Sequence, residues 1–146
     1  MTESFVLIKE NYREVYNRYI SITGSVSTTN CEEEIICDDM KFEDKNGWCL
    51  ITLLYGDSFA EEILLELSGG NELLYFYSDD VQMDCEFLAV NNNSILRKKY
   101  IYADTPELDE DEGHLQCEAE KEFKYWNDID YLIEIAKNTP NEIFKL

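Results

Sequence analysis

Three strand-like runs that follow one another along the chain are the feature that most constrains its fold. They cover residues 73–78, 83–90 and 94–103, and apolar and aromatic side chains dominate each of them. Asp79 and Asp80 form the turn after the first run, and three consecutive asparagines, residues 91–93, form the turn after the second. Connections this short join antiparallel neighbours, because parallel strands need a longer crossover. The sequence therefore predicts a β-meander.

A helix is predicted over residues 11–22, ahead of the meander. Its apolar side chains recur at the spacing of one helical face, and Gly24 ends it. We interpret the tyrosines of this face as core rather than as contact surface. The residues of the face are Tyr12, Val15, Tyr16, Tyr19 and Ile20.

Two more helices are predicted from their end signals. Asp57 or Ser58 is the predicted N-cap of the first, since Ser58 with Glu61 three residues later forms a capping-box pattern, and Gly69 stops the helix that follows. Asn127 is the predicted N-cap of a last helix, which Pro140 closes.

The order of these elements predicts the fold class. Residues 48–54 indicate a buried strand, while residues 31–39 leave a short helix and a strand both open. Helix, strand, helix, meander and helix do not alternate as a βαβ series does. We therefore predict an α+β fold, with an antiparallel sheet containing a β-meander packed against helices, mainly on one face. The length of 146 residues suits a single domain over residues 1–146.

The formal net charge of −20 is the most informative global property. Residues 104–120 hold eight acids and no Lys or Arg, and residues 32–44 hold seven acids with only Lys41. Direct binding to nucleic acid or to an anionic membrane is disfavoured, because phosphate contacts need clustered Lys and Arg. The charge favours a basic protein partner, and a role in solubility alone is the competing interpretation.

Acids on turns beside a rigid sheet are the predicted partner-binding residues, since loops on a scaffold carry much of protein recognition. The first group is Asp79, Asp80, Asp109, Glu110, Asp111 and Glu112. The second group is Glu32, Glu33 and Glu34.

No motif for catalysis, a cofactor or a metal is present. His114 is the only histidine, and no local motif ties it to a nucleophile, so we interpret it as a solvated loop residue. The five cysteines are scattered without zinc-ligand spacing, and we expect reduced thiols, with Cys49 and Cys85 in the core. The sequence has no signal-peptide pattern and no apolar run long enough to cross a bilayer. We therefore expect a soluble cytoplasmic protein.

A further pattern runs over residues 73–136, less than half of the chain. In these residues the chain resembles the immunity proteins of bacterial polymorphic toxin and contact-dependent growth inhibition systems. The residues that carry the resemblance are Leu73-Leu74-Tyr75-Phe76 with Phe87-Leu88-Ala89-Val90, Leu96-Arg97 with Tyr100, Gly113-His114-Leu115-Gln116-Cys117-Glu118, and Trp126 with Asp128. We expect Gly113, Glu118, Trp126 and Asp128 to be structural, with the Trp126 indole buried.

The resemblance implies a cytoplasmic protein that binds and neutralises one cognate toxin domain, with no enzymatic residues to carry over. The charge fits this role, because many toxins hold phosphate in basic clefts onto which an acidic inhibitor is steered. Two other interpretations stay open: an acidic DNA mimic that occupies a nucleic-acid-binding protein, and an adaptor subunit. An enzyme is disfavoured by the missing motif. The oligomeric state is left open.

Overall fold

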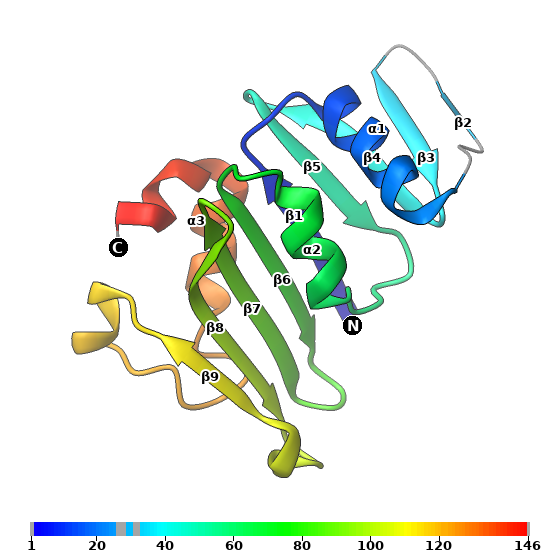
Figure 1. The fold of residues 1–146 in the computed structure, drawn as a ribbon. Helices are drawn as coiled ribbons and strands as arrows, with labels where there is room; N and C mark the ends of the chain where they lie inside the picture. The colour runs from blue at the N-terminus through cyan, green and yellow to red at the C-terminus, as the bar shows by residue number, and fades with distance from the viewer. Residues whose placement is uncertain (1, 26–28, 31–32, 146) are drawn as a thin grey trace.

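The chain folds around one antiparallel sheet, seen in a computed structural model that describes residues 2–25, 29–30 and 33–145 (Figure 1). Nine strands of these residues lie in the order β2-β3-β4-β5-β1-β6-β7-β8-β9. The strands are β1 (Thr2–Ile8), β2 (Thr29–Asn30), β3 (Glu34–Cys37), β4 (Met40–Lys45), β5 (Trp48–Leu53), β6 (Leu73–Asp79), β7 (Asp84–Asn91), β8 (Ser94–Tyr102) and β9 (Glu110–Gly113).

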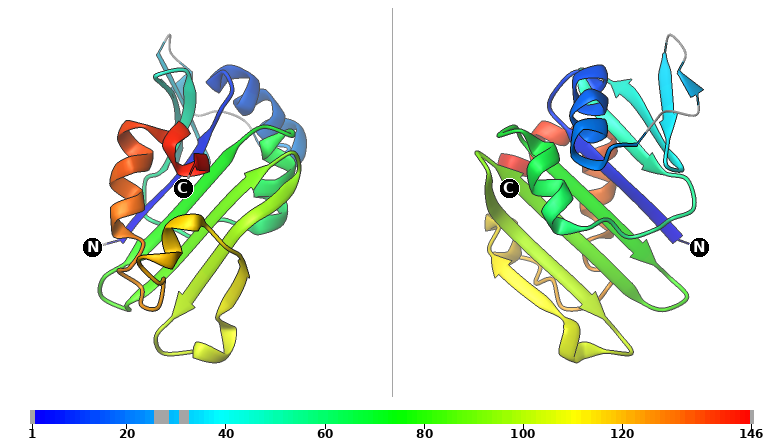
Figure 2. Two further views of the ribbon diagram at one scale, coloured as in Figure 1. Left: turned by 90° about the vertical axis from the view of Figure 1, so that its left-hand side faces the viewer. Right: turned by 45° about the vertical axis from the view of Figure 1, so that its right-hand side comes forward.

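Helices cover both faces of this sheet. Figure 2 shows α1 (Tyr12–Thr23) and α2 (Glu61–Ser68) on one side and α3 (Asp130–Asn138) on the other. Three short 3-10 helices complete the described part of the chain: η1 (Pro106–Leu108), η2 (Gln116–Ala119) and η3 (Pro140–Lys145). The α+β class is confirmed. The expectation that helices cover mainly one face is wrong, because α3 and η3 bury the second face as fully as α1 and α2 bury the first.

Strand β1 lies at the centre and feeds both hydrophobic cores. Val6 and Ile8 point to the α1 and α2 side, while Phe5 and Leu7 point to the α3 side. All four side chains are at most 4% exposed. A strand buried on both faces appears in sequence as a continuous apolar run rather than as an alternating one.

Stacked aromatic rings tie the central strands together on the α3 face. The ring centroids of Phe5 and Phe76 lie 5.1 Å apart, and those of Phe76 and Phe87 lie 4.9 Å apart. Phe123, from the segment before α3, meets Phe87 edge-on with a centroid separation of 6.4 Å. These contacts join β1, β6 and β7 to the irregular segment between η2 and α3.

Several predictions are confirmed. The three runs of the meander form β6, β7 and β8, and the first helix begins after an Asn11 N-cap whose side chain accepts from the backbone N–H of Arg13. Gly24 ends that helix with a φ of 73°, in the left-handed region where glycine has no Cβ penalty. Cys49 and Cys85 are fully buried, and the tyrosine side chains of α1 are nearly so.

The sequence patterns missed β1, β2, β4 and β9, and they left the character of β3 open. Residues 29–30, for which no strand was predicted, pair with β3. Strands β4 and β5 form a hairpin around Asn46 and Gly47, so only half of it was predicted. β9 was expected to be loop, because its four residues are acidic or glycine.

Two helix starts were also wrong. α2 begins after Ala60, which makes no side-chain cap, rather than at a Ser58 capping box. α3 begins after Ile129 rather than at an Asn127 cap. In both places the helix is fixed by packing of its apolar face on the sheet, with Leu64 and Leu132 fully buried, and local capping signals are overridden.

Candidate protein-binding surface

Three connecting segments meet at one end of the sheet, at the bottom of Figure 1. They are the turn between β6 and β7, the connection between β8 and β9 that contains η1, and the segment before α3. Met83 of the first, Pro106 of the second and Tyr125 of the third line one pocket. Segments far apart in the sequence therefore build a common surface.

The pocket at this end is largely apolar and has a volume of about 370 Å³. Met83 is 52% exposed and Tyr125 is 61% exposed. Val81 and Leu108, from the same turn and the same connection, are also exposed apolar residues. Contiguous exposed apolar side chains are characteristic of interaction sites. The pocket is lined by Met83, Ile101, Tyr102, Ala103, Pro106, Asp109, Tyr125, Trp126 and Asn127.

An acidic groove of about 400 Å³ lies beside the apolar pocket. Trp126 lines both hollows, so its half-buried side chain forms the wall between them. The other lining residues of the groove are Glu3, Ser78, Asp80, Asp130, Ile133 and Glu134. Four of these seven described lining residues are acids, and none is a Lys or Arg. We call the apolar pocket and the acidic groove together the Trp126 surface.

The turn between β6 and β7 is held by Asp79. Its Oδ1 accepts from the backbone N–H of Val81 at 2.9 Å and from that of Gln82 at 3.3 Å, and the residue is only 6% exposed. Met83 then has a φ of 60°, an uncommon value for a residue with a side chain. This geometry turns Val81 and Met83 outward while Asp79 faces its own turn.

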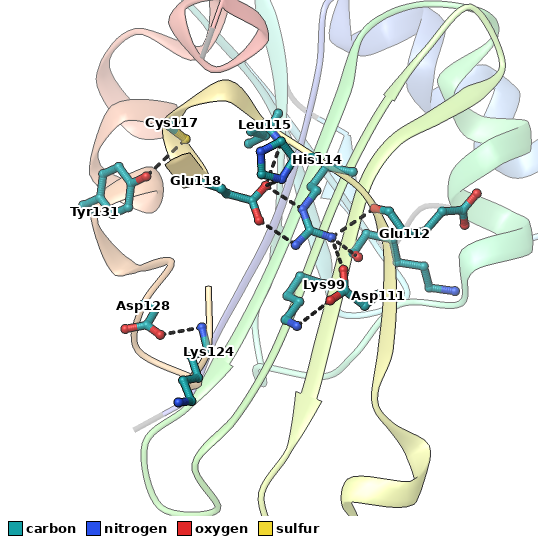
Figure 3. A network of polar contacts seen from close by, with 12 residues as sticks. Lys99, Asp111, Glu112, His114, Leu115, Cys117, Glu118, Lys124, Asp128 and Tyr131 are labelled. Carbon is teal, nitrogen blue, oxygen red and sulfur yellow. Dashed lines mark hydrogen bonds and ion pairs between the residues drawn. The ribbon is translucent and has the colours of Figure 1, made fainter. Parts of the chain in front are cut away.

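The segment that carries Tyr125 and Trp126 is fixed by residues on either side of it. Asp128 Oδ2 accepts from the backbone N–H groups of Lys124 and Tyr125, at 2.6 Å each; the first of these contacts is drawn in Figure 3. Phe123 is 2% exposed and anchors the other side in the core. The two aromatic side chains are therefore presented on a braced loop.

A polar network that contains Lys99, Asp111 and Glu118 is drawn in Figure 3, and Arg97 of β8 ties β9 and η2 to the sheet within it. The guanidinium binds Glu118 through Nε and Nη2, and its Nη1 lies 2.6 Å from Asp111 Oδ1. Lys99 Nζ lies 2.7 Å from the other oxygen of Asp111. Burial of Asp111 raises its pKa, but these hydrogen bonds to Lys99 and Arg97 outweigh it and lower the pKa overall.

The structure separates the predicted partner-binding acids into different roles. Asp80 and Asp109 are exposed and line the Trp126 surface, one in each hollow. Glu110 and Asp111 belong to β9 rather than to a loop, and their carboxylates pair with cations of β8. Glu112 is exposed on β9, and its carbonyl accepts from Arg97. Asp79 is buried in its turn.

The second predicted group gathers at another place, beside α1. Glu33 and Glu34 line a groove with Tyr12, Glu43 and Asp44, and Glu34 lies opposite Glu43 in the sheet register. Lys41 Nζ is 3.0 Å from Glu43. Glu32 lies outside the described residues.

His114 is exposed between β9 and η2, with Nδ1 at 3.8 Å from a Glu118 oxygen. Within residues 2–25, 29–30 and 33–145 no group of His, Cys, Asp and Glu has the arrangement of a metal site. In the same residues no helix has the length and apolar character needed to cross a membrane.

Most residues that define the Trp126 surface carry no pattern that marks them as functional in the sequence. Met83, Tyr125, Asp130 and Glu134 were not selected, and Trp126 was expected to be buried. A usable signal was the run of aromatic residues in a segment without helical or strand periodicity, 123–126, where an aromatic side chain lacks an obvious core position.

Comparison of the chain with protein-family models, with curated proteins and with solved structures found no match.

Proposed function

We propose that this chain is an immunity-type protein, which binds a basic toxin domain through the Trp126 surface and neutralises it. One observation carries the proposal: an apolar pocket and an acidic groove lie side by side and share the wall formed by Trp126. Apolar and aromatic residues at the centre with polar residues around them are the usual anatomy of a protein interface.

The net charge supports a basic partner. A net charge of −20 attracts a cationic domain before the two proteins touch. This attraction raises the association rate. Toxins that act on nucleic acid hold phosphate in basic clefts, so occupation of such a cleft by this protein would block them. This charge argument is independent of the resemblance to immunity proteins, which rests on the residue pattern over 73–136.

The arrangement of the acids favours this function over DNA mimicry. A mimic replaces phosphates with rows of free carboxylates, whereas the carboxylates of Glu110 and Asp111 are paired with Lys98, Arg97 and Lys99 of the same chain. An apolar pocket has no counterpart on a phosphate backbone either.

We also propose that the protein works in the cytoplasm. Cys37, Cys49, Cys85 and Cys117 are free thiols, and the first three are buried. Free cysteines are typical of a reducing compartment.

The test begins with capture of the partner from the producing cells by the tagged protein, followed by measurement of binding to the purified partner. Tyr125→Ala should weaken binding at least about tenfold, as loss of an interfacial aromatic does. Tyr55→Ala is the matched control, because Tyr55 is also an exposed tyrosine but lies in the turn after β5.

Co-expression with the captured toxin domain then measures neutralisation. The wild type and Tyr55→Ala should restore growth, and Tyr125→Ala should restore it less. A partner that is not toxic to cells, or one that binds both variants as tightly as the wild type, contradicts the proposal.

A further inference from the structure

The acidic groove holds more negative charge than its own lining neutralises. Lys137 of α3 pairs with Glu3, whereas no Lys or Arg of the described residues forms an ion pair with the carboxylate of Asp130 or Glu134. Burial raises the pKa of Asp130, and the nearby Glu3 and Asp128 raise it further, against a smaller lowering by Lys121. A cation placed in the groove would relieve this repulsion.

Trp126 adds a second recognition element to the same groove. An indole face is the best aromatic partner for a cation, and guanidinium groups stack on it more readily than ammonium groups do. A planar guanidinium can also bind a carboxylate through two parallel hydrogen bonds. Carboxylates and an indole in one groove therefore match arginine better than lysine.

The apolar pocket on the other side of Trp126 has the opposite chemistry. Its exposed members, Met83 and Tyr125, offer a flexible thioether and an aromatic ring, both suited to an aliphatic or aromatic side chain. A ligand that reaches both hollows must therefore carry an apolar group and a cation close together.

We propose that the Trp126 surface recognises a segment of the partner protein in which an arginine and a large apolar residue lie close together. The arginine occupies the acidic groove against Trp126, and the apolar side chain occupies the pocket of Met83 and Tyr125. The inference rests on the proposed function for the identity of the partner as a toxin domain, but its chemistry can be tested with peptides alone.

The probes are capped peptides with one leucine and one arginine, separated by zero to four alanines. Binding is followed by NMR through the indole N–H signal of Trp126 and the carboxyl signal of Asp130. At least one spacing should shift both signals and lower the pKa of Asp130. In the peptide that binds best, citrulline in place of arginine removes the charge but keeps the shape, and should abolish the shift at Asp130. Lysine in its place should bind more weakly.

Variants of the protein separate the two hollows. Asp130→Asn with Glu134→Gln should remove the preference for arginine over citrulline, while Tyr125→Ala should remove the preference for leucine over alanine. Glu66→Gln on α2 is the control for the acids, since Glu66 is an exposed helical glutamate on the opposite face. It should leave both preferences unchanged.

The inference is overturned if no peptide moves the Trp126 and Asp130 signals at millimolar concentration, or if arginine and citrulline peptides bind equally well. It is also overturned if the shifts map to the groove of Glu33 and Asp44. These outcomes differ from failure of the proposed function. A captured toxin that depends on Tyr125 but not on Asp130 and Glu134 supports the function alone. If the peptides bind as expected but no toxin is captured from the cells, the results support the inference and not the proposed function.

Discussion

The guanidinium of Arg97 and the carboxylate of Glu118 form a two-point ion pair, with Nε 2.8 Å from Oε2 and Nη2 2.8 Å from Oε1. The two side chains are 3% and 6% exposed. Glu118 Oε2 also accepts from the backbone N–H of Leu115 at 2.6 Å. One buried pair thus fixes η2 against β8 and starts the connection that ends at Tyr125 and Trp126.

Glu118→Gln should destabilise the fold by about 3 kcal/mol, because removal of one charge leaves the other buried without its main partner. Asp111 still contacts Arg97, so the loss should stay near the lower end of the usual range. Urea unfolding measures the effect. Glu112→Gln is the control, since that side chain is exposed, and its stability should match the wild type. Equal stability of both variants would show that the ion pair contributes nothing net.

Gly113→Ala should be destabilising for a steric reason. A Cβ at Gly113 would lie 2.0 Å from the carbonyl oxygen of Leu96, and the φ of 77° is already unfavourable for alanine. Gly47→Ala, at a φ of 88° with nothing within 4 Å of the added Cβ, has only the backbone strain of about 1–2 kcal/mol. We expect Gly113→Ala to lose at least about 1 kcal/mol more than that in thermal or urea unfolding. Equal losses would mean that β9 moves away from β8 without penalty.

Phe123→Ala and Trp126→Ala should differ in what they disturb. Phe123 is 2% exposed, and its truncation should cost about 3–5 kcal/mol of stability. Trp126 is only half-buried, so its truncation should cost less, about 1–3 kcal/mol, while it weakens partner binding. Unfolding curves and partner affinity for both variants test this. A larger loss of stability for Trp126→Ala than for Phe123→Ala would show that Trp126 is a core residue, as the sequence predicted.

Asp111 and Asp130 should affect stability with opposite signs as the pH changes. The pKa of Asp111 is lowered in the fold, so its contribution is present above the unfolded value and is lost as the pH falls through the folded pKa. The pKa of Asp130 is raised, because burial and Glu3 disfavour its charged form. The fold therefore gains stability from Asp130 as the pH falls through its raised pKa.

At pH 7, Asp111→Asn should lower the free energy of unfolding and Asp130→Asn should raise it slightly. The Asp130 difference should shrink below the ordinary aspartate pKa of about 3.9, where the unfolded carboxyl group is protonated as well, and the Asp111 difference should shrink as the pH falls further through its lowered folded pKa. Urea unfolding at several pH values measures them. Two variants that change stability in the same direction at pH 7 would contradict the assignment.

Glu134→Lys should slow association with the captured partner, and more so at low salt than at high salt. Steering acts over a Debye length of about 8 Å at physiological ionic strength, so added salt screens it. Glu66→Lys makes the same change of charge on α2, on the other face of the sheet. Equal association rates for the two variants at every salt concentration would show that the net charge acts without regard to the Trp126 surface.

Charge reversal of Asp111 is expected to have a different effect from that suggested by the sequence. As a loop acid, Asp111 could be reversed with little change in folding. In the structure its carboxylate lies between Arg97 and Lys99, so a lysine there would place three cations together. We therefore expect Asp111→Lys to loosen β9, which circular dichroism and hydrogen exchange at β9 can detect.

The sequence by itself determined the elements whose signals are local. The meander follows from apolar runs separated by short turns, and α1 follows from the spacing of its tyrosines between Asn11 and Gly24, because each signal lies within a few residues of the structure it specifies.

Only the tertiary structure decided the elements and sites that depend on distant partners. β1 finds its place between β5 and β6, and β9 is a strand because Glu110 and Asp111 meet Lys98, Arg97 and Lys99 of β8. The Trp126 surface likewise exists only where the turn at Met83, the segment of Tyr125 and helix α3 converge. Pairing and burial between residues far apart in the chain leave neither a two-residue nor a 3.6-residue period in either partner, so a search for such periods does not find them.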